Sequence, residues 1–258
     1  MKMMSMSMCK QSVPLLDMIP PPTLNFDMLN TPRPKDKVVI VMGATGTGKS
    51  RLSIDLATRF PAEIINSDKI QVHQGLDILT NKITEEERRG VPHHLLSVLP
   101  PTADFTSANF RDMCSLAIES SLSRGHLPII VGGSNTYIEA LVDDDDMRFR
   151  SRYECCFLWV DVSMPVLHSA VSKRVDRMVD NGMVEEVRSF FKFNADCTRG
   201  IRKAIGVPEL DKFFMVEPFL KQEEREKLLE EAIQEIKKNT CKLARRQSEK
   251  IHRLRNIK

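Results

Sequence analysis

The sequence predicts an α/β fold: a parallel sheet flanked by helices, with a smaller, mainly helical C-terminal lobe. The first observation is that short apolar runs of strand length alternate with stretches of helical periodicity up to about residue 163. Such alternation is typical of parallel strands joined by helical crossovers. The second is that beyond Asp161 apolar residues recur only at helical spacing.

Four apolar runs are expected to form the strands of this sheet. They are residues 38–42, 62–67, 128–131 and 155–162. A helix is expected from Phe105 to Leu122, ending at Gly125. In the C-terminal lobe, apolar residues mark one face of a helix until Asn181-Gly182 interrupts it, and a second helix is expected over 183–191. The region from Gln222 to about Arg255 is expected to form one long helix, or two in series.

The chain of 258 residues is long enough for one large domain, or for one domain with a smaller lobe. We expect a disordered or transit segment over residues 1–36, an α/β core over 37–163, and a helical lobe with a basic C-terminal helix over 164–258. The first sixteen residues contain no acid, which is typical of an organelle transit peptide and equally of a plain disordered start. Prolines at 20–22 and at 32 and 34 indicate a linker.

Composition excludes several classes of protein. No run approaches the roughly eighteen apolar residues of a membrane span. Six cysteines occur without a C-x-x-C pair, so we expect a reduced compartment and no zinc site. The net charge of +3 hides an asymmetry, because residues 237–258 contain nine bases and only one acid, Glu249. The rest has 29 bases and 34 acids, so the C-terminal end is a cationic arm on a mildly acidic body.

One motif identifies a binding site. Gly43, Ala44, Thr45, Gly46, Thr47, Gly48, Lys49 and Ser50 match the phosphate-binding loop G-x-x-x-x-G-K-[ST], between an expected strand and an expected helix. The glycines let successive N–H groups point into one hollow, and the helix N-terminus adds positive potential. Lys49 supplies a point charge, and the Ser50 hydroxyl can hold Mg²⁺. The core is therefore expected to be P-loop NTPase-like and to bind a polyphosphate.

Other polar residues should lie near this loop, because the carboxyl ends of parallel strands gather at one edge of the sheet. Asp68 follows the second strand, where it could be a base acting on a second substrate. A turn aspartate that accepts backbone hydrogen bonds is an equal alternative. Gly132–Tyr137 begins a helix, where it could contact a nucleotide or could only cap the helix and pack a tyrosine.

Two further features favour structural roles. Asp161 is a candidate Walker-B acid, but capping of the following helix by Asp161 or Ser163 is the favoured interpretation. The pair His93-His94 lacks a third ligand at suitable spacing, so packing or hydrogen bonding near the nucleotide is favoured over a metal site.

Several motifs in order resemble the adenine isopentenyltransferases. Besides the phosphate loop, they are NSDKIQVHQGLDILTNK (66–82), GVPHHLL (90–96), GGSNTY (132–137) and the stretch 167–187 around Arg174. The resemblance covers about residues 37–255 and is greatest to the plant adenylate isopentenyltransferases, through FRSRY (149–153), CCFLWVDV (155–162) and RKAIGVPE (202–209). It implies transfer of the dimethylallyl group from dimethylallyl diphosphate to N6 of an adenine nucleotide, with release of pyrophosphate, as the first step of cytokinin synthesis. It also favours a plastid over the cytoplasm.

The resemblance implies roles for individual residues. Asp68 matches the base that orients the adenine amine and takes its proton, and Thr45 matches a threonine beside the oxygen that joins C1 to phosphorus. Lys49, Arg174, the loop amides and Mg²⁺ at Ser50 would bind the diphosphate. The residues expected to bind the nucleotide are Ser67, Asp68, Gly133, Ser134, Lys242, Arg245 and Arg246.

Two other functions remain open at this point. A tRNA dimethylallyltransferase of the same family could use the cationic arm to follow a phosphate backbone. A P-loop small-molecule kinase would bind ATP in the loop, although the absence of an early Walker-B acid disfavours it. The sequence does not rank ATP, ADP and AMP, but the arm should favour ATP and ADP.

Overall fold

The phosphate loop joins the central strand of a parallel sheet to its first helix. The structure is a computed structural model that describes residues 34–143, 148–193 and 195–255. The strands are β1 (Asp36–Met42), β2 (Ala62–Asn66), β3 (His93–His94), β4 (Leu127–Val131) and β5 (Tyr153–Trp159). They pair in parallel in the order β3-β2-β4-β1-β5. The predicted parallel sheet is therefore confirmed, and β3 is an additional two-residue strand too short to recognise from periodicity.

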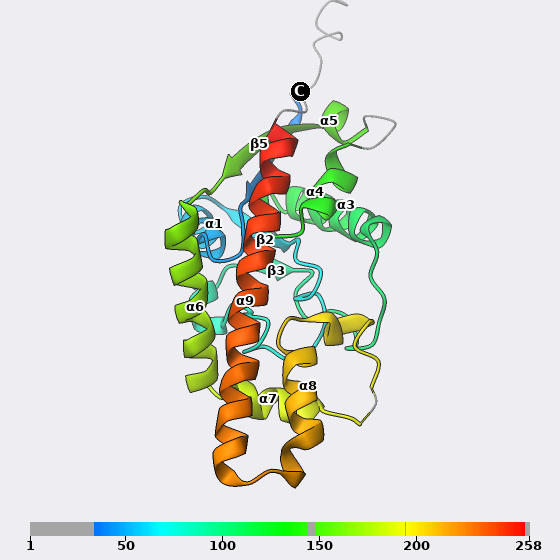
Figure 1. The fold of residues 1–258 in the computed structure, drawn as a ribbon. Helices are drawn as coiled ribbons and strands as arrows, with labels where there is room; N and C mark the ends of the chain where they lie inside the picture. Colours follow the sequence, from blue (N-terminus) through cyan, green and yellow to red (C-terminus); the bar gives the residue numbers. More distant parts are fainter. Residues whose placement is uncertain (1–33, 144–147, 194, 256–258) are drawn as a thin grey trace, which may run out of the picture. The chain divides into compact units, whose positions relative to one another are not determined.

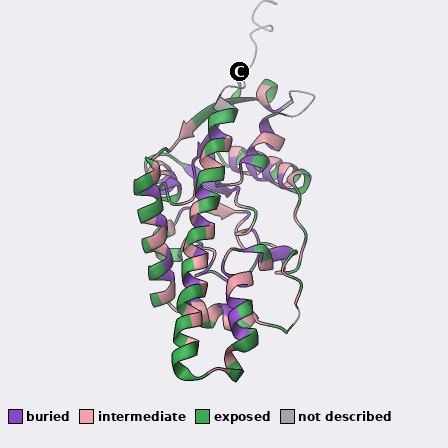
Figure 2. Cartoon of the chain, in the orientation of Figure 1, coloured by how far each residue is buried: buried purple, intermediate pink, exposed green. Residues whose placement is uncertain are grey.

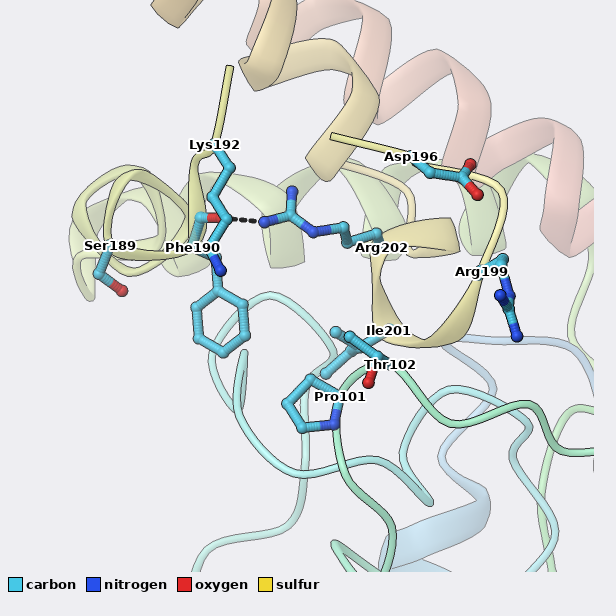
Figure 3. Close-up of a pocket in the computed structure, with 9 residues that line it drawn as sticks. All are labelled: Pro101, Thr102, Ser189, Phe190, Lys192, Asp196, Arg199, Ile201 and Arg202. Atoms are coloured by element: carbon cyan, nitrogen blue, oxygen red, sulfur yellow. Dashed lines mark hydrogen bonds between the residues drawn. The ribbon is translucent and has the colours of Figure 1, made fainter. Parts of the chain in front are cut away.

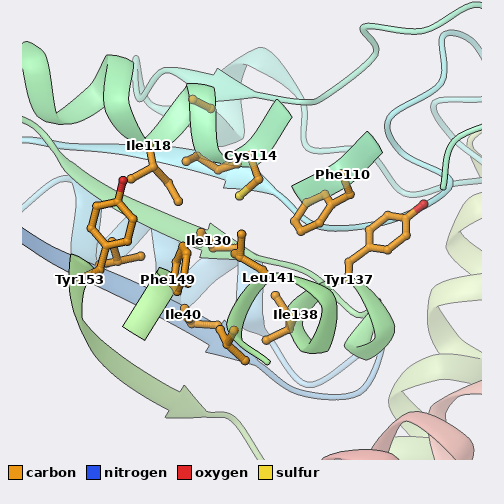
Figure 4. Packing of buried hydrophobic residues seen from close by; sticks show 14 of the residues in the cluster. Ile40, Phe110, Cys114, Ile118, Ile130, Tyr137, Ile138, Leu141, Phe149 and Tyr153 are labelled. Atoms are coloured by element: carbon orange, nitrogen blue, oxygen red, sulfur yellow. The ribbon is translucent and has the colours of Figure 1, made fainter. Parts of the chain in front are cut away.

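Helices cover both faces of the sheet because alternate strand residues point to opposite sides. On one face, Ile40 and Ile130 pack against Phe110 of α3 (Ser107–Ser123) and Ile138 of α4 (Asn135–Val142), as Figure 4 shows. On the other face, Val41 packs with residues of α1 (Lys49–Ala57). The short helices α2 (Glu85–Arg88) and α5 (Arg148–Arg152) lie in the connections.

The remaining elements are helical, as expected. They are α6 (Met164–Asp180), α7 (Met183–Phe190), η2 (Gly200–Lys203), α8 (Val207–Val216), η3 (Glu217–Phe219) and α9 (Gln222–Arg255). Val175, Met183, Leu210 and Ile236 belong to one buried cluster that holds four of these helices together. Gly182, at φ +92°, separates α6 from α7, in agreement with the predicted break.

Helix α9 is a single helix of 34 residues that connects the helical elements with the sheet. Ile236 packs in the helical cluster, whereas Ile251 packs in the cluster against the sheet. Figure 1 shows α9 beside α6 along much of its length, and Figure 2 shows their outward faces exposed. The helix therefore brings its C-terminal half close to the phosphate loop.

The described residues from Lys35 onward belong to one compact unit. The proposed division at residue 163 into a core and a lobe stays a prediction. The expected transit segment lies almost entirely outside the described residues. Among the described helices, none combines the length and apolar content that crossing a bilayer requires.

Candidate active site

The phosphate loop is shaped by close contacts and by glycine backbone angles. Gly48 has φ +92° at the start of α1, a region that side-chain-bearing residues rarely adopt. A Cβ on Gly43 would lie 2.6 Å from the carbonyl oxygen of Val160, so only glycine fits there. The loop thus folds back on the ends of β1 and β5, and its helix N-terminus faces the cavity described below.

Lys49 is nearly buried, with 9% of the residue exposed. Its Nζ donates a 2.7 Å hydrogen bond to the carbonyl oxygen of Ala44 within the loop. Burial lowers the pKa of Lys49 to about 8, partly offset by the negative charge of Asp68, and the positive charge of Arg174 adds to the decrease. An arriving anion would stabilise the charged form of Lys49 and raise this pKa.

Arg174 of α6 contacts the phosphate loop directly. Its Nη2 donates a 2.8 Å hydrogen bond to Oγ1 of Thr45, and its Nε is buried without a partner among the described residues. Burial lowers the pKa of Arg174. A partly buried guanidinium whose buried Nε donor is unused is suited to bind an anionic ligand.

Asp68 lies in the same electrostatic environment. Its Oδ1 accepts hydrogen bonds from the amides of Ile70 at 2.9 Å and Gln71 at 3.3 Å. The carboxylate acts on Lys49 and Arg174 by its charge, so it faces the loop as the sequence predicted. The turn role occupies Oδ1, and no hydrogen bond to Oδ2 occurs within the part of the chain that the structure describes. Asp68 can therefore serve the turn and act as a base at once.

The loop after β4 lies against the loop after β2. Ser67 is fully buried, and a Cβ on Gly132 would lie 2.4 Å from its backbone carbon. The amide of Lys69 donates a 3.0 Å hydrogen bond to Oγ of Ser134. Ser134 makes no side-chain cap to α4, so the capping interpretation is wrong for it.

The tyrosine that follows is packed, as that interpretation expected. Tyr137 is 5% exposed and donates a 3.0 Å hydrogen bond to the carbonyl oxygen of Phe105. Its ring stacks on Phe110 at 4.7 Å between centroids. Burial, with the charge of Asp68, raises the pKa of Tyr137 to about 12, so it stays neutral.

One cavity of about 1020 Å³ brings most of these groups together. The predicted residues that line it are Thr45, Gly46, Gly48, Lys49, Ser50, Asp68, Gly133 and Arg174. Ile78, Leu79 and Met178 add apolar surface to the same cavity. Polar groups suited to an anion thus lie beside a surface suited to a hydrocarbon group.

The cationic arm is placed differently from the phosphate loop. Lys242, Arg245 and Arg246 are exposed on α9 and are not among the residues that line the cavity. Lys242 donates to Asn239 at 3.2 Å, and Arg245 donates to Glu249 at 3.0 Å. Their proposed contact with nucleotide phosphates stays a prediction.

Sequence reasoning missed Gln247, which lies between the three exposed bases and the cavity. Its Oε1 accepts a 2.8 Å hydrogen bond from the amide of Thr45, and its Nε2 donates at 2.9 Å to the carbonyl oxygen of Gly133. A signal was available, because Ala244 and Ile251 are buried on α9 and Gln247 interrupts their stripe at helical spacing.

Two structural expectations need comment. Asp161 is exposed and accepts a 3.0 Å hydrogen bond from the amide of Val162. The N-cap of α6 is Ser163, which makes no side-chain cap, so the expected capping by either residue is wrong. The second expectation concerns His93 and His94, for which the sequence favours packing or hydrogen bonding over a metal site. A ring nitrogen of His94 lies 2.6 Å from the carboxylate of Glu63, and a ring nitrogen of His93 lies 2.8 Å from the carbonyl oxygen of Val91.

The residues present fit a magnesium ion that arrives with its anion. Ser50 is exposed in the first turn of α1 and lines the cavity. Among the described residues no group of three His, Cys, Asp or Glu side chains could hold a metal by itself. Because Mg²⁺ keeps several waters and takes its other ligands from substrate phosphates and few protein groups, the hydroxyl of Ser50 is a suitable ligand for it.

A second hollow of about 560 Å³ lies away from the phosphate loop, between α7 and η2 (Figure 3). Its two arginines already have partners within the protein. Arg199 binds Asp104 at 2.5 Å, and Arg202 donates to the carbonyl oxygen of Phe190. This hollow also lies apart from the phosphate loop and from Asp68, none of which lines it.

Comparison with known proteins agrees with the geometry. The chain matches the IPP transferase family over residues 71–151 and 143–253. It is 66% identical over 264 residues to adenylate isopentenyltransferase 3, chloroplastic, of Arabidopsis thaliana, which covers 98% of this chain and 77% of the relative. It is also 61% identical over 247 residues to adenylate isopentenyltransferase 5, chloroplastic, of the same plant, an alignment that covers 93% of this chain and 74% of the relative.

Solved structures share the fold. A eukaryotic dimethylallyltransferase acting on tRNA superposes with a TM-score of 0.71 at 26% identity, covering 82% of this chain and 69% of that one. A tRNA isopentenylpyrophosphate transferase of Bacillus halodurans superposes with a TM-score of 0.69 at 27% identity, covering 84% of this chain and 87% of that one. The phosphate loop, the fold and these similarities agree, and the chain belongs to the IPP transferase family, among the plant adenylate isopentenyltransferases.

Proposed function

We propose that this protein transfers the dimethylallyl group of dimethylallyl diphosphate to N6 of an adenine nucleotide, releasing pyrophosphate, as the first step of cytokinin synthesis. The observation that carries the proposal is the single cavity that joins Asp68, Thr45, Lys49 and Arg174. The chloroplastic names of two similar relatives support action in a plastid, and a mitochondrial relative in Arabidopsis thaliana, 55% identical, makes the organelle a matter for experiment.

The acceptor amine requires help because its lone pair is delocalised into the adenine ring. Asp68 would accept a hydrogen bond from the N6 amine through its carboxylate, orient it toward C1 and take the proton that leaves. Its Oδ1 is anchored by the amides of Ile70 and Gln71, so the carboxylate stays in place when a substrate enters.

The donor's bond between C1 and oxygen breaks, and negative charge develops on pyrophosphate. Fixed positive groups should therefore surround the leaving group rather than the phosphates of ATP, which do not react. Lys49, Arg174 and the loop amides would bind the diphosphate, and Thr45 would donate to the bridging oxygen. Mg²⁺ held by Ser50 and the diphosphate would neutralise further charge when bound.

A tRNA acceptor is the second candidate, favoured by one observation. Both described structural neighbours are named for activity on tRNA, and they share 26% and 27% identity with this chain. The identity of 66% to an adenylate enzyme favours the free nucleotide. A kinase would place ATP in the phosphate loop, which the similar proteins do not support.

Incubation with dimethylallyl diphosphate and ATP, ADP, AMP or tRNA tests the proposal. We expect pyrophosphate and an N6-dimethylallyl nucleotide, with ATP and ADP used better than AMP. Release of ADP from ATP without prenylation would indicate phosphoryl transfer from ATP, to water or to another acceptor, in place of prenyl transfer, and prenylation of tRNA alone would establish the second candidate.

A Lys49→Ala variant then identifies whose phosphates occupy the loop. We expect severe loss of turnover and of pyrophosphate binding, with the affinity for ATP nearly unchanged. A loss of ATP affinity of roughly a hundredfold, or about 3 kcal/mol, would restore the ordinary ATP-binding loop.

A further inference from the structure

Gln247 of α9 uses its whole side-chain amide to join two loops of the active site. Its Oε1 accepts from the amide of Thr45 at 2.8 Å, and its Nε2 donates to the carbonyl oxygen of Gly133 at 2.9 Å. Because an amide side chain carries an acceptor and a donor on one rigid plane, it can satisfy a backbone N–H and a backbone C=O together. Neither a carboxylate nor a hydrocarbon of similar size can do both.

These contacts belong to a continuous chain between the proposed base and the proposed leaving-group site. From Asp68 the chain passes to Lys69, whose amide binds Oγ of Ser134 at 3.0 Å. Ser134 follows Gly133, and Gln247 connects Gly133 to Thr45. One path of contacts between Asp68 and Thr45 therefore runs through Gln247.

Gln247 is held in place because α9 is anchored to α4 at this residue and at Lys250. Its backbone carbonyl accepts a 3.0 Å hydrogen bond from Nδ2 of Asn135, and Lys250 pairs with Glu139 at 2.5 Å. Ala244 and Ile251, on either side along the helix, are buried. Close packing supports the contact, since a Cβ on Gly133 would lie 2.6 Å from Nε2.

We propose that Gln247 is a positioning residue for the prenyl transfer, and this rests on the proposed function. It sets the distance between the amine held by Asp68 and the donor oxygen beside Thr45. It does so from a helix that contributes no reacting group. The displacement requires the attacking nitrogen within about 3–3.5 Å of C1, and a misplacement of about 1 Å can cost about 10²-fold in rate. Loss of the brace should therefore lower kcat more than it weakens the binding of either substrate alone.

Two substitutions test the brace. Gln247→Met keeps the length of the side chain and removes both hydrogen bonds, and Gln247→Glu keeps an acceptor for Thr45 but opposes the Gly133 carbonyl with a carboxylate oxygen. We expect kcat to fall about 10- to 100-fold in both. The separate dissociation constants of pyrophosphate and ATP should change less than threefold, and the melting temperature by only a few degrees. Ser248→Ala, on the next residue of α9, is the control and should match the wild type.

A double substitution tests the path through Gly133. Gly133→Ala should displace Nε2 and lower kcat, whereas in a Gln247→Ala background it should lower kcat little further, because the brace is already gone. The proposal would be overturned if Gly133→Ala lowered kcat by the same factor in the Gln247→Ala background as in the wild type. It would also be overturned by a kcat of Gln247→Met within threefold of wild type, or by a loss that only parallels weaker binding and lower stability. A wild-type protein that yields no prenylated product would instead overturn the proposed function, and this inference with it.

Discussion

Arg174 of α6 donates a 2.8 Å hydrogen bond to Oγ1 of Thr45, a residue 129 positions earlier in the chain. The contact joins the helical part of the chain to the phosphate loop at the point where the donor oxygen is expected. It also orients the Thr45 hydroxyl, because a guanidinium can only donate, so the hydroxyl proton is directed elsewhere. The phosphate loop of this protein is therefore completed by a side chain from another element.

Replacement of Arg174 by Lys tests this completion. Lys keeps the positive charge but loses the planar fork that can contact Thr45 and an anion together. We expect kcat to fall about 10- to 100-fold, on the order of the loss of one preorganised donor, measured by pyrophosphate release. Lys173→Arg, on the exposed neighbouring position, should behave as wild type. Equal activity of Arg174→Lys and wild type would reduce Arg174 to a general positive charge.

Asp68→Asn separates the base from the turn. Asn retains an acceptor for the amides of Ile70 and Gln71, so the turn and the melting temperature should be preserved. Turnover at saturating substrates should fall by about 10²–10⁴-fold while nucleotide affinity stays within a few-fold. The control is Asp161→Asn, which also accepts from a following amide but lies outside the cavity. Retention of more than about a third of wild-type turnover by Asp68→Asn would leave Asp68 only a turn residue.

The buried Lys49 predicts a pH dependence of donor binding. Its pKa of about 8 lies below the ordinary 10.5 because burial disfavours the charged form. Below pH 8 the ammonium is present to bind the diphosphate, and above pH 8 each binding event must take up a proton. Affinity for dimethylallyl diphosphate, titrated without acceptor, should therefore weaken progressively as pH rises through 8 to 10. Lys49→Arg stays charged throughout and should lose this dependence; an unchanged profile would show that another group titrates.

Glu63 predicts a pH dependence of stability. Its carboxylate, 3% exposed as a residue, accepts from Arg124 at 2.6 Å and Ser121 at 2.8 Å and contacts His94. The hydrogen bond from Arg124 is the main cause that lowers the pKa of Glu63 from 4.5 to about 2. Its stabilisation is therefore present above pH 4.5 and lost as pH falls toward 2.

Glu63→Gln should lower the free energy of unfolding at pH 7 by roughly 1–3 kcal/mol, less than for a fully buried pair because Arg124 is half exposed. Chemical denaturation measures it, with exposed Glu154→Gln as the control. The difference from wild type should shrink between pH 4.5 and 2. A constant difference over that range would place the pKa of Glu63 elsewhere.

The cationic arm is expected to recognise the terminal phosphates of the acceptor. Replacing Lys242, Arg245 and Arg246 together by Ala should raise KM for ATP more than KM for AMP, because each added phosphate offers further charge to pair. Steady-state kinetics with both nucleotides measures the difference. Equal effects on both KM values would show that these three side chains only form a solvent-exposed face of α9. Salt-sensitive tRNA binding that the variant loses would indicate a polynucleotide partner.

Local sequence was sufficient for the sheet and the phosphate loop. Apolar runs of strand length predicted four of the strands, and Asn181-Gly182 predicted the break between α6 and α7, because these features depend on near neighbours in the chain. The two-residue β3 was missed, since too few residues repeat for a period to appear, and the ten-residue α8 was missed as well.

The sequence by itself determined the kind of chemistry: a loop that binds a polyphosphate, a carboxylate at the next strand end, and a family resemblance that names the reaction. Only the tertiary structure decided how those parts are joined. Arg174 binds Thr45, which lies 129 positions away in the sequence. Gln247 binds Thr45 and Gly133, which lie 202 and 114 positions away from it. No local pattern specifies such contacts, because they follow from the packing of α6 and α9 against the sheet, which the whole chain determines. For that reason the sequence shows Gln247 only as a polar residue within an apolar stripe, and the structure alone shows that its side chain joins the two loops.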